Sequence, residues 1–253
     1  MSKENLKLWD SVCSTDPSAT KSYKGVGGFS GTAINSIYLI RKATELFGPI
    51  GIGWGYEIIS ETITEGAPIA VPVEGASPVL SDYKEKIHTL RLKLWYKHNG
   101  ERGETEHFGH TQMVYVNKYG IQTEQEPSKK SLTDAMKKCL SMIGFSADIF
   151  LGEFDDAEYR DQVKTEYDIK KAENREEEIV IKQLELTEYV TRHLAVIKTA
   201  VSVNEIAGIS KSAIRHLDRQ GMIAELKQIS NRGIIAITDQ AEARKKEIKN
   251  ETL

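Results

Sequence analysis

The fold of this chain is decided by the stretch Lys129-Lys130-Ser131-Leu132-Thr133-Asp134-Ala135-Met136-Lys137-Lys138-Cys139-Leu140-Ser141-Met142-Ile143-Gly144-Phe145. Its apolar residues recur at helical spacing and share one side of the predicted helix: Leu132, Met136, Cys139, Leu140 and Ile143. The opposite side carries Lys130, Lys137 and Lys138, with Asp134 as the only acid among them. Such a helix can pack on a sheet and face a polyanion, but the same pattern is typical of a helix whose lysines only keep a protein in solution.

The composition is that of an ordinary globular chain. Hydrophobic residues make up 40% and charged residues 28% of 253 residues, enough for one substantial domain with a smaller module or for two modest domains. The net charge is −3, so any nucleic-acid binding must come from a local patch. Cys13 and Cys139 form no metal-binding spacing, which fits a reducing cytoplasm. We expect neither a secretory signal nor a membrane partner, because the first ten residues are polar and no apolar run approaches the length of a membrane span.

The distribution of prolines and glycines separates the chain into two halves. All six prolines lie at or before Pro127, which predicts strands and turns first and helices afterwards. We therefore expect an α+β fold class in which a helix, a three-stranded antiparallel meander and the basic helix form a core, with one face of the sheet covered. The expected elements are a helix over 32–47, strands over 54–63, 86–98 and 105–116, a hairpin turn at Asn99-Gly100, and a loop over 66–80.

Four parts follow from this pattern. Residues 1–24 are expected to be a flexible arm and residues 25–156 the core. Residues 157–183 carry both charge signs and predict a charged helical linker. Residues 184–253 predict a mostly helical module that docks onto partner proteins.

The predicted strand over 86–98 carries a second basic surface. Its alternation directs Leu90, Leu92, Leu94 and Tyr96 to one face, and a basic set to the other, namely Arg91, Lys93, Trp95 and Lys97. Cations with a flat ring between them suit single-stranded nucleic acid, because the ring can stack on a base. Alternating lysines also protect exposed sheets against edge pairing, although an exposed tryptophan is seldom kept without a use. Both interpretations stay open.

Other motifs carry less weight. The glycine-rich stretch over 25–31 misses GxGxxG by one position, and no GxxxxGK[ST] occurs, so we expect no nucleotide loop. His107 and His110 fall on opposite faces of a predicted strand and are read as ordinary polar residues. Asp155, Asp156 and Glu158 could suggest a metal-dependent nuclease, yet they also suit the start of a helix, which we favour. We therefore predict no catalytic residue, no metal and no cofactor, and hence no enzyme.

A second DNA-binding class is suggested by residues 203–217, which resemble a helix-turn-helix, with 221–223 and 233–237 as a possible wing. The gap between Ala207 and Ser210 is short for a turn between two complete helices. A transcriptional regulator that reads duplex DNA is therefore the alternative function, and a partner-docking module is the preferred interpretation.

A family resemblance joins these observations. The motif Thr133-Asp134-Ala135-Met136-Lys137-Lys138-Cys139-Leu140-Ser141-Met142-Ile143-Gly144, followed by an acidic stretch, resembles the basic helix of the single-strand annealing proteins. This group includes the eukaryotic Rad-type annealing mediator and phage proteins of the Sak and ERF types. The passage Ala43-Thr44-Glu45-Leu46-Phe47-Gly48 to Trp54-Gly55-Tyr56-Glu57-Ile58 is similar to the helix-to-first-strand passage of the group. The resemblance covers about residues 25–156.

The resemblance implies an ATP-independent protein of phage homologous recombination and DNA repair. Such a protein forms rings or filaments, binds single-stranded DNA in a positive groove and anneals it into duplex. The repeated subunits then offset a negative net charge. The C-terminal module resembles the variable tails of phage annealing proteins, for which a single-strand-binding protein or an exonuclease is a candidate partner.

The resemblance also implies which residues hold the DNA. Lys137 and Lys138 match the basic pair of the inner DNA strand, while Tyr38 and Ser141 stand where the eukaryotic relatives place arginines. We expect all the cations to gather on one surface, with Arg41 or Lys42 compensating for the missing arginines. The predicted DNA-binding set is Lys129, Lys130, Lys137, Lys138, Arg91, Lys93, Trp95, Lys97, Arg41 and Lys42.

Overall fold

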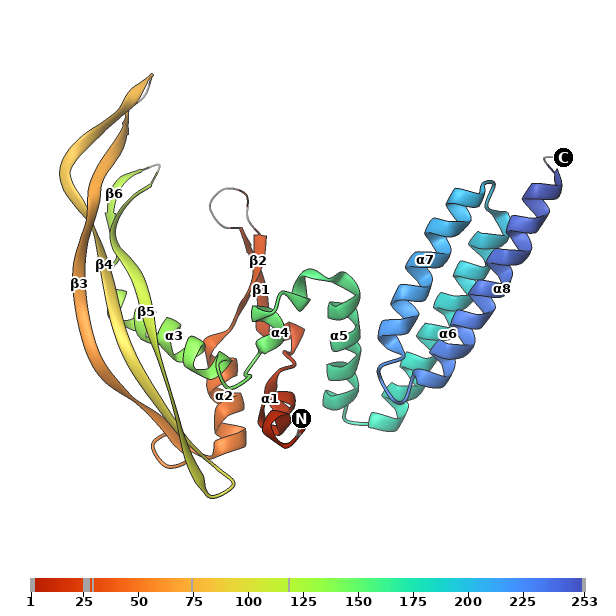
Figure 1. Ribbon diagram of the computed structural model, residues 1–253, viewed down its shortest axis with the longest axis horizontal. Coiled ribbons are helices and arrows are strands. Elements are labelled where there is room, and N and C mark those ends of the chain that lie inside the picture. Colours follow the sequence, from red (N-terminus) through yellow and green to blue (C-terminus); the bar gives the residue numbers. More distant parts are fainter. Residues whose placement is uncertain (1–2, 25–27, 29, 74, 118, 252–253) are drawn as a thin grey trace. The chain divides into compact units, whose positions relative to one another are not determined.

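The computed structural model describes residues 3–24, 28, 30–73, 75–117 and 119–251 of the chain (Figure 1). The chain divides into two compact units. Unit 1 comprises Met1–Thr15 and Ala19–Leu151, and unit 2 comprises Asp16–Ser18 and Gly152–Leu253. The boundary lies near the expected end of the core, but the segment expected to be a linker belongs to unit 2.

Unit 1 is built on a four-stranded antiparallel sheet, and the α+β class is confirmed. The strands follow the order β3-β4-β5-β6, with bounds Trp54–Val73, Ala76–His98, Glu101–Asn117 and Gly120–Thr123. The sheet therefore has a fourth strand beyond the expected meander. The hairpin at Asn99-Gly100 is confirmed, and both residues have the positive φ that such a turn requires, 52° and 82°.

The expected loop over 66–80 is wrong. β3 and β4 instead continue as a two-stranded ribbon in which Val73 pairs with Ala76. The three prolines that suggested a loop are accommodated because β3 is an edge strand and β4 pairs with β5 only from Lys86 onward. A proline whose missing N–H would face solvent costs no ladder hydrogen bond, and register shifts around Pro68 absorb the remaining irregularity.

The basic helix is α3, Pro127–Ser141, which lies across β4 and β5 (Figure 1). Leu90, Leu92 and Leu94 are fully buried beneath it, as the alternation of the strand predicts. From the helix, Ala135, Met136, Cys139 and Leu140 join the same core, together with Leu39, Ala43 and Phe47 of helix α2, Ser36–Phe47. Burying a side chain of this kind contributes about 1.5–3 kcal/mol, so the contact between α3 and the sheet contributes substantially to the stability of unit 1.

Most of residues 3–24 lie in regular elements, so the flexible arm expected over residues 1–24 is wrong for the part of it that the structure describes. Lys3–Leu6 form a 3-10 helix and Lys7–Val12 form α1. After a second 3-10 turn at Pro17–Ala19, β1 (Thr20–Lys24) pairs with β2 (Ser30–Ile34) as a hairpin. Because β2 occupies residues 30–34, α2 begins later than the expected position 32.

Unit 2 is helical, as expected of the C-terminal region. A short helix α4 (Ala147–Phe150) closes unit 1, and a 3-10 turn at Glu153–Asp155 opens unit 2. Four helices follow, namely α5 (Ala157–Lys171), α6 (Arg175–Thr199), α7 (Val203–Gln220) and α8 (Lys227–Glu251). Their core includes Leu186, Ile197, Ile206, Leu217, Leu226 and Ile237.

The helix-turn-helix expected over 203–217 does not form. These residues lie in the single uninterrupted helix α7, with Gly208 inside it, and the expected wing segment 233–237 lies in α8. The motif that suggested a reader of duplex DNA is therefore absent from this region as described. In the described part of the chain no helix combines the length and the apolar character needed to cross a membrane.

The close approach of α3 to β5 predicts that a substitution of Gly109 strongly lowers the stability of unit 1. A Cβ on Gly109 of β5 would overlap the carbonyl oxygen of Ser131 and lie 2.6 Å from the backbone nitrogen of Ala135. We expect Gly109→Ala to lower the free energy of unfolding of unit 1 by about 1–3 kcal/mol, because the helix must move away from the sheet. Urea unfolding followed by tryptophan fluorescence measures this, since Trp9, Trp54 and Trp95 all lie in unit 1.

A matched control is Gly208→Ala in α7, where an added Cβ meets no atom within 4 Å. It should leave the tryptophan transition unchanged and stabilise α7 by up to about 1 kcal/mol. Equal transitions for Gly109→Ala and the parent chain would contradict the close approach of α3.

Candidate nucleic-acid interface

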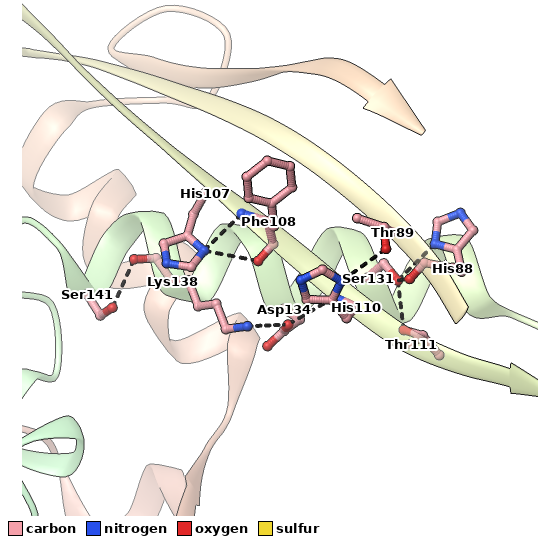
Figure 2. Close-up of polar contacts among 10 residues, drawn as sticks. All are labelled: His88, Thr89, His107, Phe108, His110, Thr111, Ser131, Asp134, Lys138 and Ser141. Carbon is pink, nitrogen blue, oxygen red and sulfur yellow. Dashed lines mark hydrogen bonds and ion pairs between the residues drawn. The ribbon is translucent and has the colours of Figure 1, made fainter. Parts of the chain in front are cut away.

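A buried polar network fastens α3 to the sheet (Figure 2). His88 of β4 is buried, and its Nδ1 lies 2.9 Å from Ser131 Oγ of α3. Its Nε2 lies 2.7 Å from Glu61 Oε1 of β3. Ser131 Oγ is also 2.8 Å from Thr111 Oγ1 of β5. Ser128, in the first turn of α3, donates a hydrogen bond of 2.7 Å to Glu61. The hydrogen bonds from Ser128 and His88 lower the pKa of Glu61 below its ordinary value.

The order serine, histidine, carboxylate is that of an activated nucleophile. Ser131 is 0% exposed, however, so no substrate can reach its hydroxyl. The network therefore serves to hold the helix in place. The network was not predicted from the sequence. A signal for it was nevertheless present, since His88 has the same strand parity as Leu90 and therefore faces the core.

The main candidate site is a hollow of about 340 Å3 between α3, the β1–β2 hairpin and α4. The residues that line it are Tyr23, Thr32, Ala33, Ile34, Asp134, Lys137, Lys138, Ile149 and Phe150. The predicted basic pair Lys137 and Lys138 thus lies in a concave site. The hairpin and α4 were not expected from the sequence, so the aromatic members of the hollow, Tyr23 and Phe150, were missed.

Charges in the hollow are unequally engaged. Lys138 Nζ lies 2.9 Å from Asp134 Oδ2, which also accepts a hydrogen bond of 3.3 Å from the backbone N–H of His110 (Figure 2). Lys137 forms no ion pair with any other described residue. Tyr23 and Phe150 are 47% and 53% exposed. The hollow therefore offers an uncommitted ammonium group, a second one held in position, and two aromatic surfaces.

The other predicted cations of the helices have partners outside this hollow. Lys129 pairs with Glu126 at 3.1 Å, Lys130 with Glu124, and Arg41 with Glu45 at 2.8 Å. The hydrogen bond to Glu124 raises the pKa of Lys130. Lys42 Nζ donates to the carbonyl oxygens of Val12 and Ser14, both at 2.7 Å, so it anchors the N-terminal segment. Tyr38 packs against the core, and Ser141 donates to the carbonyl of Lys138.

The basic set on β4 does not share the surface of α3. Because α3 covers the face that carries Leu90, Leu92 and Leu94, the alternating residues project from the opposite face. The expectation of one continuous cationic surface is therefore wrong. The apolar side of α3 must cover the apolar side of β4, and this places the two basic sets on opposite sides of the sheet.

On that opposite face the cations are matched by acids of β5. Arg91 pairs with Glu106, and Lys93 lies 3.9 Å from Glu104. Lys97 forms no ion pair with another described residue and lies opposite Arg102 in the ladder.

The Trp95 ring, which was expected to stack on bases, is engaged within the chain. It packs over Gly55, and the guanidinium carbon of Arg102 lies 4.8 Å from its ring centre. Base stacking on this ring would require Arg102 to move.

Two of the three acids that suggested a nuclease, Asp156 and Glu158, have partners within unit 2. Asp156 is the N-cap of α5 and accepts the Glu158 backbone N–H at 3.0 Å. Its carboxylate also pairs with Arg215 at 2.8 Å and Arg219 at 3.2 Å. Hydrogen bonds with the side chain and backbone of Glu158, together with Arg215, lower the pKa of Asp156 from 3.8 to about 2. Among the described residues no group of three or more acids, histidines or cysteines is arranged to hold a metal ion.

The two histidines of β5 make local hydrogen bonds (Figure 2). His107 Nδ1 accepts the backbone N–H of Phe108 at 2.8 Å, and His110 Nδ1 lies 3.0 Å from Thr89 Oγ1.

No protein-family model and no curated protein matches this chain.

The polar network predicts a measurable contribution to stability. Ser131→Ala removes the hydroxyl between His88 and Thr111 and leaves buried polar atoms without a partner. We expect the free energy of unfolding of unit 1 to fall by about 1–3 kcal/mol, measured by tryptophan fluorescence in urea. The exposed Ser128→Ala is the control and should cost less than about 1 kcal/mol. Equal effects of the two substitutions would exclude a special role for the buried hydroxyl.

The pairing of Asp156 predicts a pH dependence of unit 2. Its pKa is lower in the folded chain than its ordinary value, so its contribution is complete above about pH 4 and is lost as the pH falls towards 2. Asp156→Asn keeps a good N-cap but removes the charge. We expect the variant to melt below the parent at pH 7, with the difference vanishing near pH 2, as followed by circular dichroism. A difference that is constant across this range would contradict the assignment.

Proposed function

We propose that this chain binds single-stranded DNA in the hollow along α3 and anneals complementary strands without ATP. The observation that carries the proposal is the ammonium group of Lys137, which forms no ion pair with another described residue, beside Lys138 in a hollow with two exposed aromatic residues. Single-stranded DNA presents a phosphate and an unstacked base at every nucleotide. Ammonium groups can bind the phosphate, and the rings of Tyr23 and Phe150 can stack on a base. Each base that stacks on an aromatic ring contributes about 1–3 kcal/mol to binding.

Annealing requires a grip on the backbone that leaves the pairing edges of the bases free. Lysines supply such a grip because phosphate contacts carry no sequence information. The resemblance of residues 25–156 to single-strand annealing proteins supports the same function. We place the chain in phage homologous recombination and DNA repair, in the cytoplasm of a bacterial host.

A single hollow has few free cations, so one subunit alone would bind weakly. We propose that the chain acts as a homo-oligomer, ring or filament, in which neighbouring hollows hold one strand together. Linked sites of this kind strengthen binding without any new type of contact. Unit 2 is proposed to recruit a single-strand-binding protein or an exonuclease.

DNA binding tests which surface is used. We expect the double variant Lys137→Ala with Lys138→Ala to bind an oligothymidine more weakly than the parent in fluorescence anisotropy. Its salt dependence should also fall by a slope of about 0.7 for each lost phosphate contact. The matched control is Arg91→Ala with Lys93→Ala on the opposite face of the sheet, which should change both quantities little.

If the Arg91 and Lys93 variant instead bound DNA more weakly than the Lys137 and Lys138 variant, the DNA-binding site would lie on the face of the sheet opposite α3. Annealing is measured separately by mixing complementary oligonucleotides with the parent chain in the absence of ATP. Duplex should form faster than it does spontaneously, and more slowly with the Lys137 and Lys138 variant. A rate equal to the spontaneous one would reject strand annealing as the function.

A further inference from the structure

An apolar strip lies on the exposed side of α6. Val180, Ile181 and Leu184 are all exposed, and Leu184 is 59% exposed. These residues fall within about one and a half helical turns, so they form a continuous patch. Helical spacing places three glutamates of α6 beside the patch, and none of them forms an ion pair with any other described residue, namely Glu176, Glu177 and Glu188.

The other end of the same helix carries several lysines, among which Glu205, Glu242 and Glu247 also occur. α6 ends at Thr199, and the turn to α7 displays Val201, which is 80% exposed, and then Val203. The last turns of α8 lie beside this turn, as shown by the hydrogen bond of 3.1 Å from Arg244 Nε to the carbonyl oxygen of Ala200. The cations of this end that form no ion pair with another described residue are Lys198, Lys245, Lys246 and Lys249.

The turn that displays Val201 is firmly held. Ser202 caps α7 by accepting the Glu205 backbone N–H at 3.2 Å, and Glu205 accepts the backbone N–H of Val201 at 2.9 Å. An exposed apolar side chain on a preorganised turn loses little entropy when it docks, which favours binding.

Helix dipoles explain only part of this pattern. Acids in the first turn of α6 and cations in the last turn of α8 complement the helix termini. The dipole does not explain why three large apolar residues face solvent within the acidic region, nor why a valine is displayed within the basic region. Exposed apolar residues with charged borders are typical of protein contact surfaces.

The two surfaces cannot meet within one subunit. Ile181 and Thr199 are both in α6, and their separation corresponds to about 27 Å along the helix axis. A second copy of the chain, by contrast, can bring its basic valine end against the acidic strip of the first. Charge and apolar character are complementary in that arrangement, since each surface supplies what the other lacks.

We infer that unit 2 mediates a head-to-tail contact between two copies of this chain, in which the Val201 turn of one copy docks on the Val180–Leu184 strip of the next. Such a contact joins two different surfaces and therefore continues from subunit to subunit as a ring or a filament. It does not depend on the DNA-binding hollow and is expected without DNA.

The contact is tested by cross-linking full-length chains in the absence of DNA. One chain carries Leu184→Cys and the other Val201→Cys, and a short bismaleimide is added to each alone and to their mixture. The mixture should give a cross-linked dimer that contains one chain of each kind. Each variant alone should give no more cross-linked dimer than the parent chain. The parent chain supplies the background, because its Cys139 is buried and its Cys13 is half-buried.

Charge reversal identifies the surfaces. Glu177→Lys with Glu188→Lys in the first chain, or Lys246→Glu with Lys249→Glu in the second, should lower the yield about fivefold. Reversal of both together should restore it. Lys211→Glu, on the exposed surface of α7, is the matched control and should change nothing.

Two results would overturn the inference. One is a yield in the mixture no higher than that of the parent chain. The other is an equal yield from a single variant alone, which would show a symmetric contact. Neither result bears on DNA binding by the hollow, so the two proposals fail independently.

Discussion

The contact between α3 and the sheet is the constraint on which the rest of unit 1 depends. Gly109 lets the helix backbone approach β5 closely, and the buried leucines of β4 supply the apolar contact. The hydrogen bond between His88 and Ser131 fixes the position of α3 on the sheet, because the ring nitrogens of a buried histidine need hydrogen-bond partners. With the apolar side of α3 set against the sheet, Lys137 and Lys138 are turned towards the β1–β2 hairpin, which creates the hollow.

Ion pairing determines how many of the predicted cations are immediately available to a polyanion. Lys129 is held by the exposed Glu126 and Lys130 by the half-buried Glu124, and ion pairs near the protein surface are weakened by solvent. A phosphate can therefore displace these carboxylates at small cost. Lys42 is different, because its ammonium group holds two backbone carbonyls of the N-terminal segment, which would lose their partner. The presence of a lysine or arginine in the sequence therefore does not show that its charge can bind a phosphate. The partner that each cation already has is a better guide.

Much of unit 1 could be predicted from the sequence where the signal was local. Periodicity predicted the apolar sides of α3 and β4, and Asn99-Gly100 predicted the turn between β4 and β5. The failures involve contacts that periodicity does not contain. The hollow brings the β1–β2 hairpin, which lies near the start of the chain, against α3 and α4 in its middle, and periodicity within one element does not predict such a contact. Neither Tyr23 nor Phe150 could therefore be assigned to the hollow. The ribbon was missed because its prolines were read without regard to which edges of the strands stay unpaired.

The expectation of one cationic surface failed for a reason that the sequence already contained. If the apolar sides of α3 and β4 face each other, the alternating cations of β4 must lie on the far side of the sheet from the helix. The pattern of each element was correct, but the two patterns had to be satisfied together. The same joint reading applies to α6, where exposed apolar residues lie beside carboxylates that form no ion pair with another described residue. A helix whose exposed side departs from the usual polar composition is explained by what binds there, and the basic valine end of a second copy has the complementary chemistry.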